Sequence, residues 1–277
     1  MTAAPWDRLP DDLVLEPIWD RLQVPIMTQV DDKLKLPDLT PVKAAFAAAL
    51  AALLVRWGPI KQAWTEQLTS QVQLLADDNT PQGFASLGVD SSQGAAVLHD
   101  AMASYAPASA AHVVAEAQAQ GVTVPPQVGP SDQMAAQAEV TAALLAGALA
   151  LSAGNEAQRV HRRGRSGRDT ADDVRVHLDG LSDSAPRNQL GYALHTAELG
   201  ARLATLLYST GVRLYSAELM DTHLCVPCRD IDGTLLGVSG GDVSKLHLLY
   251  PNGGYVHCKG GINCRGTVIG IWPREGE

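Results

Sequence analysis

The sequence predicts a mainly α-helical protein that ends in a small α+β module, in which a short antiparallel β meander is pinned by a cysteine cluster. Alanine is abundant and aromatic residues make up only 5% of the 277 residues, a composition that favours close-packed helices over a large β-sandwich. Apolar residues recur at helical spacing through much of residues 40–209. Beyond Gly211 short β-rich stretches replace this period, and all four cysteines lie there.

We expect three regions: an extended acidic arm at residues 1–39, a helical domain at 40–187 and the cysteine module at 188–277. A chain of 277 residues can bury a proper core. The net charge of −9 argues against a general footprint on duplex DNA, which would be basic. The proline-punctuated arm either packs on its own domain or docks on a neighbouring subunit. Its apolar anchors are Trp6, Trp19 and Leu22.

The first helix is expected to begin at Thr40-Pro41, because threonine is a good N-cap and proline is favoured at the first helical position. Gly58-Pro59 is expected to break or kink this helix. Residues 60–77 then resume as a helix, since their apolar side chains lie near helical spacing.

Further helices are predicted by the same periodicity and by boundaries rich in proline and glycine. An alanine-rich helix begins at Ser131 or Asp132 and runs to about Val160. The longest apolar runs, residues 44–55 and 140–153, fall short of the ~20 residues that span a bilayer, so we expect buried helices and no membrane partner. The other expected helices are residues 95–105, 108–119 and 188–209, with a connector at 122–130.

A basic stretch follows the alanine-rich helix, with no acidic residue within residues 159–168. Arginine near a helix C-terminus complements the helix dipole, and the glycines indicate an exposed loop. The stretch is either a solvated loop or a contact with nucleic-acid phosphate or an acidic partner. Acidic residues at Asp169, Asp172 and Asp173 weaken the nucleic-acid interpretation. The arginines are Arg159, Arg162, Arg163, Arg165 and Arg168.

The C-terminal module is expected to contain three strands. Residues 212–218 lead into the cysteines. Asp232-Gly233 is a tight-turn signal before a second strand at 234–238, and residues 267–272 form a closing strand that Pro273 stops. A module this small has little core of its own, so a metal ion would supply much of its stability.

The four cysteines form two close pairs, Cys225-x2-Cys228 and Cys258-x5-Cys264. Two such pairs can hold one tetrahedral metal ion, and Cys-x2-Cys is the usual half-site for a structural Zn²⁺, whereas the x5 spacing is wider. Disulfides or buried, inert thiols are the alternatives. The first residues do not resemble a signal peptide, and reduced thiols in the cytoplasm would favour metal. Spare histidine ligands are His257, His223 and His247.

Three stretches in the last third of the chain carry a resemblance to a known family. They are Thr196-Ala-Glu-Leu-Gly-Ala-Arg202, Tyr215-Ser-Ala-Glu-Leu-Met-Asp-Thr-His-Leu-Cys225-Val-Pro-Cys228-Arg-Asp-Ile-Asp-Gly233 and Asn263-Cys264-Arg265-Gly266-Thr267. Their order and spacing resemble the phage Mu F-like minor head protein family, whose members are phage head morphogenesis proteins. That family joins a helical region to acid-x3-Cys-x2-Cys, Asp-Gly and His-Pro-x-Cys-Arg-Cys. The resemblance covers roughly residues 196–272.

The chain departs from this family pattern at two places. The usual Cys-Arg-Cys is Cys264-Arg265-Gly266 here, so one thiol is missing. The usual His-Pro is replaced by residues 259–262, while His257-Cys258 lies slightly upstream. Cys258 in place of the missing ligand would preserve four thiolates.

The resemblance implies a minor structural protein of a tailed-phage head that contacts the portal, the major capsid protein on the inner capsid surface, or both. Its location would be the virion head interior, and the host cytoplasm during assembly. We expect no enzymatic activity, because the sequence has no Gly-rich phosphate loop, Gly-x-Ser-x-Gly or His-Glu-x2-His motif, and four thiolates close a zinc site. The alternative is a zinc-stabilised nucleic-acid-binding protein of the virion interior that contacts packaged DNA.

Overall fold

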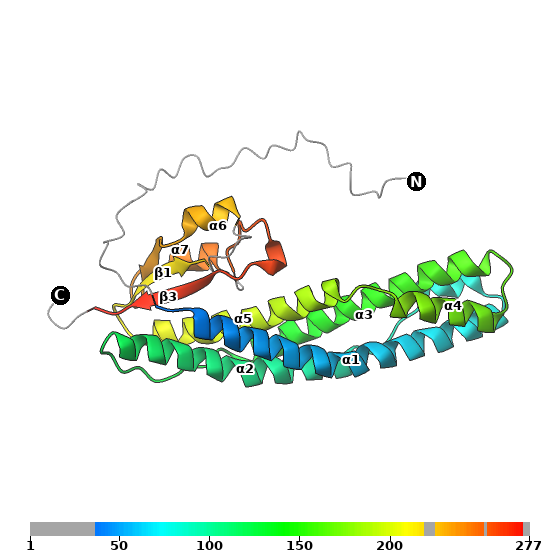
Figure 1. Cartoon of the computed structure of the whole chain (residues 1–277), viewed down its shortest axis with the longest axis horizontal. Coiled ribbons are helices and arrows are strands. Elements are labelled where there is room, and N and C mark those ends of the chain that lie inside the picture. The colour runs from blue at the N-terminus through cyan, green and yellow to red at the C-terminus, as the bar shows by residue number, and fades with distance from the viewer. Residues whose placement is uncertain (1–36, 219–224, 252–253, 274–277) are drawn as a thin grey trace. The chain divides into compact units, whose positions relative to one another are not determined.

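The computed structural model describes residues 37–218, 225–251 and 254–273, and residues Pro37–Glu277 form a compact unit distinct from Met1–Leu36. The predicted arm at 1–39 therefore lies outside the described residues, except for its last three. The described part is mainly α-helical and carries a small antiparallel sheet near its C-terminal end, as predicted (Figure 1).

Long helices make up most of the described part, and neighbours in this bundle pack along their length. Helix α2 packs against both α3 and α5, whereas α1 and α3 both pack against α4. The long helices are α1 (Thr40–Asp77), α2 (Ser92–Ala119), α3 (Ser131–His161), α4 (Gly167–Asp179) and α5 (Ser184–Tyr208). The short helices are α6 (Val226–Ile231), α7 (Ser244–Leu249) and the 3-10 turns η3 (Pro81–Ser86) and η4 (Gly261–Asn263).

Two prolines lie inside helices that were expected to be interrupted. Helix α1 continues through Gly58-Pro59, and α2 continues through Pro107, so the prediction of separate helices on either side was wrong. Both prolines are exposed. Because Pro59 has no N–H, the Val55 carbonyl lacks the hydrogen bond that a helix would normally give it, and Val55 is exposed as well. Water can satisfy a carbonyl that faces solvent, so proline costs less on the outer face than in the core.

Helix α4 was not predicted, because charged residues dominate its sequence. It is nonetheless amphipathic, with Ala171, Val174 and Leu178 buried against side chains of α1 and α3. The Ser166 hydroxyl accepts a hydrogen bond from the Asp169 backbone N–H, which caps the start of the helix.

Helices α1 and α3 expose apolar faces, so the expectation that their apolar runs are buried was wrong for those faces. Each contains an 18-residue window that is long and apolar enough to cross a membrane, and only 17% and 33% of these windows are buried. Helix α3 exposes Val140, Leu144 and Leu151 along one side. Bundle helices of soluble proteins pass the same length and composition test, and both helices also contribute core residues, so the test assigns no membrane span.

The sheet contains β1 (Arg213–Ala217), β2 (Leu235–Val238) and β3 (Thr267–Ile271) in the order β2-β1-β3. Both pairings are antiparallel, as predicted, with Leu214 opposite Gly237 on one side and Gly270 on the other. Because β1 is central, β3 adds to its far edge and not beside β2 as in a sequential meander.

Within the predicted module, the part that follows α5 shares a hydrophobic core with the helices. Leu214 and Val268 of the sheet pack in one cluster with Leu199 and Leu206 of α5. Gln120, which follows α2, donates a hydrogen bond to the Gly270 carbonyl at 3.0 Å and accepts one from the Trp272 N–H at 3.1 Å. This side chain takes the place of a further strand beside β3. The bundle therefore supplies core that so small a module lacks.

Candidate metal centre

The first cysteine pair lies at the start of α6. Cys225 is the N-cap residue of this helix, and Cys228 is buried within its first turn. The Cys225 carbonyl accepts a hydrogen bond from the Arg229 N–H at 3.0 Å, and Pro227 occupies the start of the helix, where no N–H donor is needed. This short turn brings both thiols of the Cys-x2-Cys pair to the same side.

The second pair lies on a series of tight turns. Cys258 N–H donates to the Tyr255 carbonyl, Gly261 N–H to the Cys258 carbonyl and Cys264 N–H to the Gly261 carbonyl. The thiols accept backbone hydrogen bonds as well, from Gly260 to Cys258 and from Tyr255 to Cys264, each at 3.3 Å. The hydrogen bond from Tyr255 lowers the pKa of the Cys264 thiol, against the stronger effect of burial.

Three thiols from the two pairs converge. The Sγ atoms of Cys225, Cys228 and Cys258 all lie within 4.8 Å of one another, and 3.9 Å separates the Cys225 and Cys258 sulfurs. Two thiolates on one tetrahedral zinc ion lie about 3.8 Å apart, a distance that follows from the Zn–S bond length. All four cysteines are free thiols. Together they form a cluster that could hold a metal ion, as predicted.

Cys264 belongs to a second group of converging side chains, which includes Glu218, a residue that was not predicted as a ligand. Its Sγ, the Cys228 Sγ and a carboxylate oxygen of Glu218 lie within 4.8 Å of one another, and all three residues are buried. Cys228 is thus common to both groups. The sequence signal was an acidic residue at the end of an otherwise buried strand pattern, directly after β1, where a carboxylate needs a partner.

Glycine makes room for Glu218. A Cβ atom at Gly266 would overlap the carboxylate oxygens of Glu218. The Glu218 carboxylate therefore occupies the space that a side chain at position 266 would need. In the family pattern given above, this position is the last cysteine of Cys-Arg-Cys. The Tyr250 hydroxyl donates a hydrogen bond of 2.6 Å to the same carboxylate, and the Asp232 side chain accepts one from the Glu218 backbone N–H at 2.8 Å.

Burial and backbone donors shift the pKa values of these groups in different directions. The backbone hydrogen bond from Cys228 is the main reason that the pKa of the Cys225 thiol falls to about 7. Burial raises the pKa of the Cys264 thiol to about 11 and also raises the pKa of Cys228. Burial likewise raises the pKa of Glu218, against the hydrogen bonds from Tyr250 and Cys228. The Cys225 thiol is therefore more readily ionised than the Cys228 and Cys264 thiols when no metal is bound.

The predicted spare histidine ligands do not join these groups in the described part of the chain. His257 is exposed, and its ring centroid lies 5.4 Å from that of Tyr255. His247 is exposed on α7. His223 lies outside the described residues.

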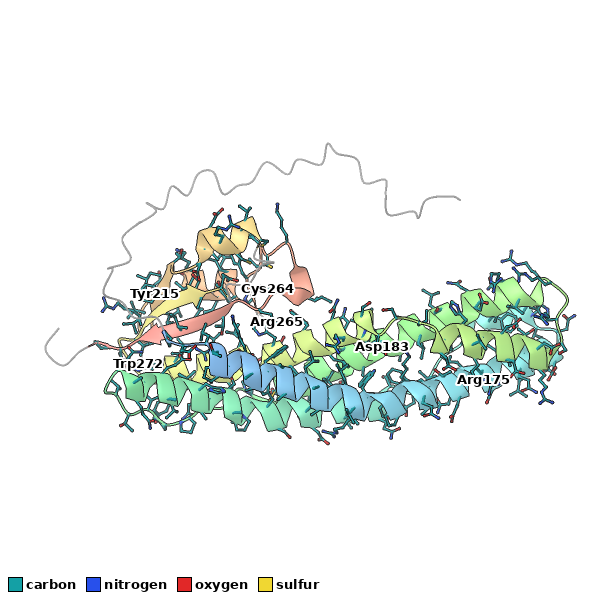
Figure 2. All side chains as sticks on the ribbon, in the orientation of Figure 1. Arg175, Asp183, Tyr215, Cys264, Arg265 and Trp272 are labelled. Atoms are coloured by element: carbon teal, nitrogen blue, oxygen red, sulfur yellow. The ribbon has the colours of Figure 1, made fainter. Side chains whose placement is uncertain are left out.

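Arg265, beside the buried Cys264, reaches from the module to the helices (Figure 2). Its guanidinium lies over the Phe46 ring, 4.9 Å from the centroid, and donates to the carbonyls of Ile262 and Cys264. A cavity of about 190 Å³ lies at this junction. It is lined by Val42, Lys43, Phe46, His195, Glu198 and Arg265.

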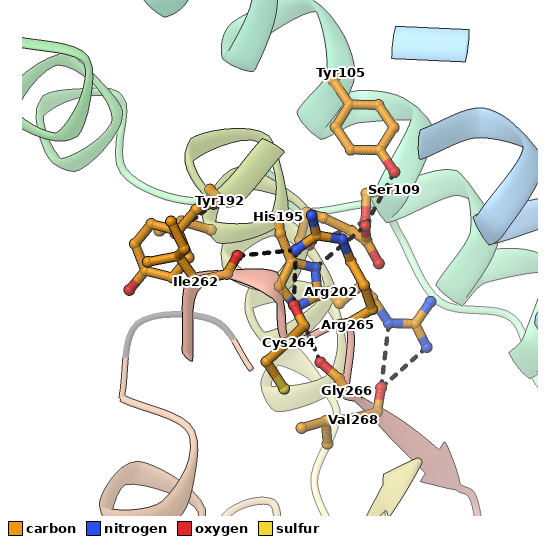
Figure 3. A network of polar contacts seen from close by, with 12 residues as sticks. Tyr105, Ser109, Tyr192, His195, Arg202, Ile262, Cys264, Arg265, Gly266 and Val268 are labelled. Carbon is orange, nitrogen blue, oxygen red and sulfur yellow. Dashed lines mark hydrogen bonds and ion pairs between the residues drawn. The ribbon is translucent and has the colours of Figure 1, made fainter. Parts of the chain in front are cut away.

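Polar side chains of α5 bind the segment that follows Cys264 (Figure 3). The His195 Nε2 lies 3.0 Å from the Gly266 carbonyl oxygen, and Arg202 donates to the Val268 carbonyl from Nε at 3.2 Å and from Nη2 at 3.0 Å. These contacts attach β3, and the segment that joins it to Cys264, to the helical bundle.

The predicted arginine stretch lies far along the chain from the cysteine cluster and is part helix, part turn. Arg159 forms an ion pair with Glu156, and Arg165 forms one with Asp173 at 3.3 Å. The Arg162 Nε donates to the Gln158 carbonyl at 3.1 Å. Two of the five positive charges are therefore already matched by acidic neighbours.

Comparison with protein-family models, with curated proteins and with solved structures found no match to the chain.

Proposed function

We propose that the chain is a minor structural protein of a tailed-phage head, which acts in head morphogenesis by contacting the portal, the inner capsid surface or both. The observation that carries this proposal is that the three stretches of the family pattern meet in space. Arg202, the last residue of the first stretch, binds the Val268 carbonyl directly after the third stretch, and His195, directly before the first stretch, binds the Gly266 carbonyl within the third. Glu218 of the second stretch fills the space beside Gly266 of the third. A shared pattern whose parts form one packed unit supports a common architecture.

The exposed apolar face of α3 supports a role in assembly. Val140, Leu144 and Leu151 are 57%, 59% and 67% exposed, and the residues that share this face are small. An extended apolar face on a soluble protein marks a contact with another protein or a membrane. In our proposal this face contacts the head proteins, within the virion interior after assembly in the host cytoplasm.

The cysteine cluster serves in this proposal as a structural clip that holds Zn²⁺. Sulfur ligands at tetrahedral spacing are the donor set that zinc prefers in structural sites. The ion would join α6 to the loop before β3 and leave the contact surfaces to the helices. We assign no enzymatic step to it.

Co-expression tests the assembly role directly. The chain is produced together with the portal and major capsid proteins of the same genome, and the particles are separated on a gradient. We expect the chain to sediment with procapsids in a low, fixed ratio to the portal. Capsid assembly in which the chain stays with free protein at the top of the gradient would refute the proposal.

A second candidate, a zinc-stabilised nucleic-acid-binding protein of the virion interior, depends on the arginine stretch. Arg162, Arg163 and Arg168 have exposed side chains that packaged DNA could reach. The ion pairs of Arg159 and Arg165 lower the net charge of the surface, which favours the assembly role.

A further inference from the structure

The two convergent groups described above share one sulfur atom, that of Cys228. One group is half-exposed and adds Cys225 and Cys258, while the other is buried and adds Glu218 and Cys264. Each group supplies three donor atoms within 4.8 Å of one another, which is three corners of a tetrahedron around a divalent ion. A thiolate can bridge two such ions because sulfur has more than one lone pair.

We propose that the cluster holds two divalent metal ions bridged by Cys228, with Glu218 as a ligand of the inner ion. The outer ion is bound by Cys225, Cys228 and Cys258. The inner ion is bound by Cys228, Cys264 and Glu218. The class of metal is a borderline-soft divalent ion such as Zn²⁺, for which thiolate and carboxylate are both established ligands.

The inner group lies away from water, since Glu218, Cys228 and Cys264 are 4%, 2% and 5% exposed. A divalent ion bound there would supply the counter-charge that ionised ligands need in a buried site. Among the residues that the structure describes, no lysine or arginine forms an ion pair with Glu218.

Two glycines leave room for the ligands of the inner group. Gly254 has φ of 75°, and a Cβ there would lie 3.1 Å from the Cys264 sulfur. Gly266 leaves room for the Glu218 carboxylate in the same way. The Tyr250 hydroxyl donates a hydrogen bond to one oxygen of the Glu218 carboxylate. Metal-binding side chains are commonly oriented by a hydrogen bond of this kind. Side chains at either glycine would displace a proposed ligand.

The proposal is independent of the role in head assembly and is tested by counting ions. The full chain is purified in reduced form, loaded with Zn²⁺, freed of loosely held metal and analysed by mass spectrometry for zinc per chain. We expect two ions in the wild type, one in Glu218→Gln, one in Cys258→Ser and none in Cys228→Ser. A single site with four thiolates predicts one ion in the wild type and in Glu218→Gln, and that pattern would overturn the proposal.

Cobalt gives a second readout and guards against variants that fold poorly. Two Co²⁺ ions joined by a thiolate couple magnetically, so we expect a weaker paramagnetic resonance signal per cobalt in the wild type than in Glu218→Gln. Cys264→Ser removes a different inner ligand and should behave as Glu218→Gln does, while far-ultraviolet circular dichroism checks that the helices are intact. Equal signals per cobalt in all three proteins would contradict a bridged pair.

Discussion

Arg202 and Glu116 form a buried ion pair, in which the guanidinium is fully buried and its Nη2 lies 2.9 Å from the carboxylate. The same guanidinium donates to the Val268 carbonyl. One side chain on α5 therefore binds both α2 and β3, and it secures the module on the bundle.

Arg202→Met is expected to be strongly destabilising, because it leaves the Glu116 carboxylate buried without a counter-charge. The loss should be about 3–5 kcal/mol in the free energy of unfolding. Adding Glu116→Gln removes the stranded charge and should restore part of the stability. Urea unfolding of the three proteins measures this, and a double variant no more stable than Arg202→Met would contradict the argument.

Glu198 is expected to make stability depend on pH. Burial alone would raise the pKa of this carboxyl, but His195, Arg202 and the Tyr105 hydroxyl together hold it below the ordinary value of 4.5. A lowered pKa stabilises the folded state above about pH 4.5, and this contribution is lost as the pH falls through the folded-state pKa. Glu198→Gln removes that contribution.

Urea unfolding of the wild type and Glu198→Gln at neutral pH and well below pH 4.5 tests this dependence. We expect the wild type to be more stable by about 1–3 kcal/mol at neutral pH and the difference to shrink in acid. Burial raises the pKa of the neighbouring Glu116, which contributes with the opposite sign. This main cause is common to both proteins, and Glu198 adds only a smaller rise that Glu198→Gln removes. A difference that does not change with pH would show that Glu198 is not the titrating group.

Local sequence signals predicted the elements whose boundaries are set locally. Helix α1 begins at Thr40 and α3 ends one residue beyond Val160, as the early proline and the periodicity indicate. The predicted cap was wrong, because Leu39 and not Thr40 is the N-cap of α1 and no side chain caps this helix start. Continuity through Pro59 could not be predicted, because it depends on which face of the bundle the proline occupies. Glu218 was missed for a related reason, since its contact with Gly266 joins segments distant in the sequence.

Metal removal is expected to loosen the module before the helices. Three of the hydrophobic clusters in the described residues contain no residue beyond α5, whereas Tyr250 and Trp272 pack in the cluster that the segment after α5 shares with α2 and α5. A chelator should therefore lower the temperature of the near-ultraviolet transition of these aromatic side chains and leave most of the helical signal.

Thermal melts recorded in both spectral regions, with and without chelator, measure this effect. Cys228→Ser, which removes the sulfur common to both groups, should melt as the chelated wild type does and should no longer respond to chelator. Identical melts of the wild type in both conditions would show that the cluster does not stabilise the module.

The exposed face of α3 is expected to be needed for binding to head proteins. Val140→Ser combined with Leu144→Ser removes apolar surface without touching the core, so stability should change by no more than about 0.5 kcal/mol per site. Sedimentation with procapsids should fall. Val176→Ser is a matched control on α4, where the side chain is 72% exposed. If the control and the α3 variant bind equally well, another surface makes the contact.

The arginine stretch decides between the two candidate functions. If packaged DNA is a partner, binding to duplex DNA should weaken with salt, and Arg162→Ala combined with Arg163→Ala should lower the slope of log affinity against log salt by about two. Arg159→Ala combined with Arg165→Ala should have a smaller effect, because Glu156 and Asp173 already neutralise those charges. Binding that is absent, or that salt does not change, would remove the nucleic-acid function and leave the arginines as a solvated turn or a contact for an acidic head protein.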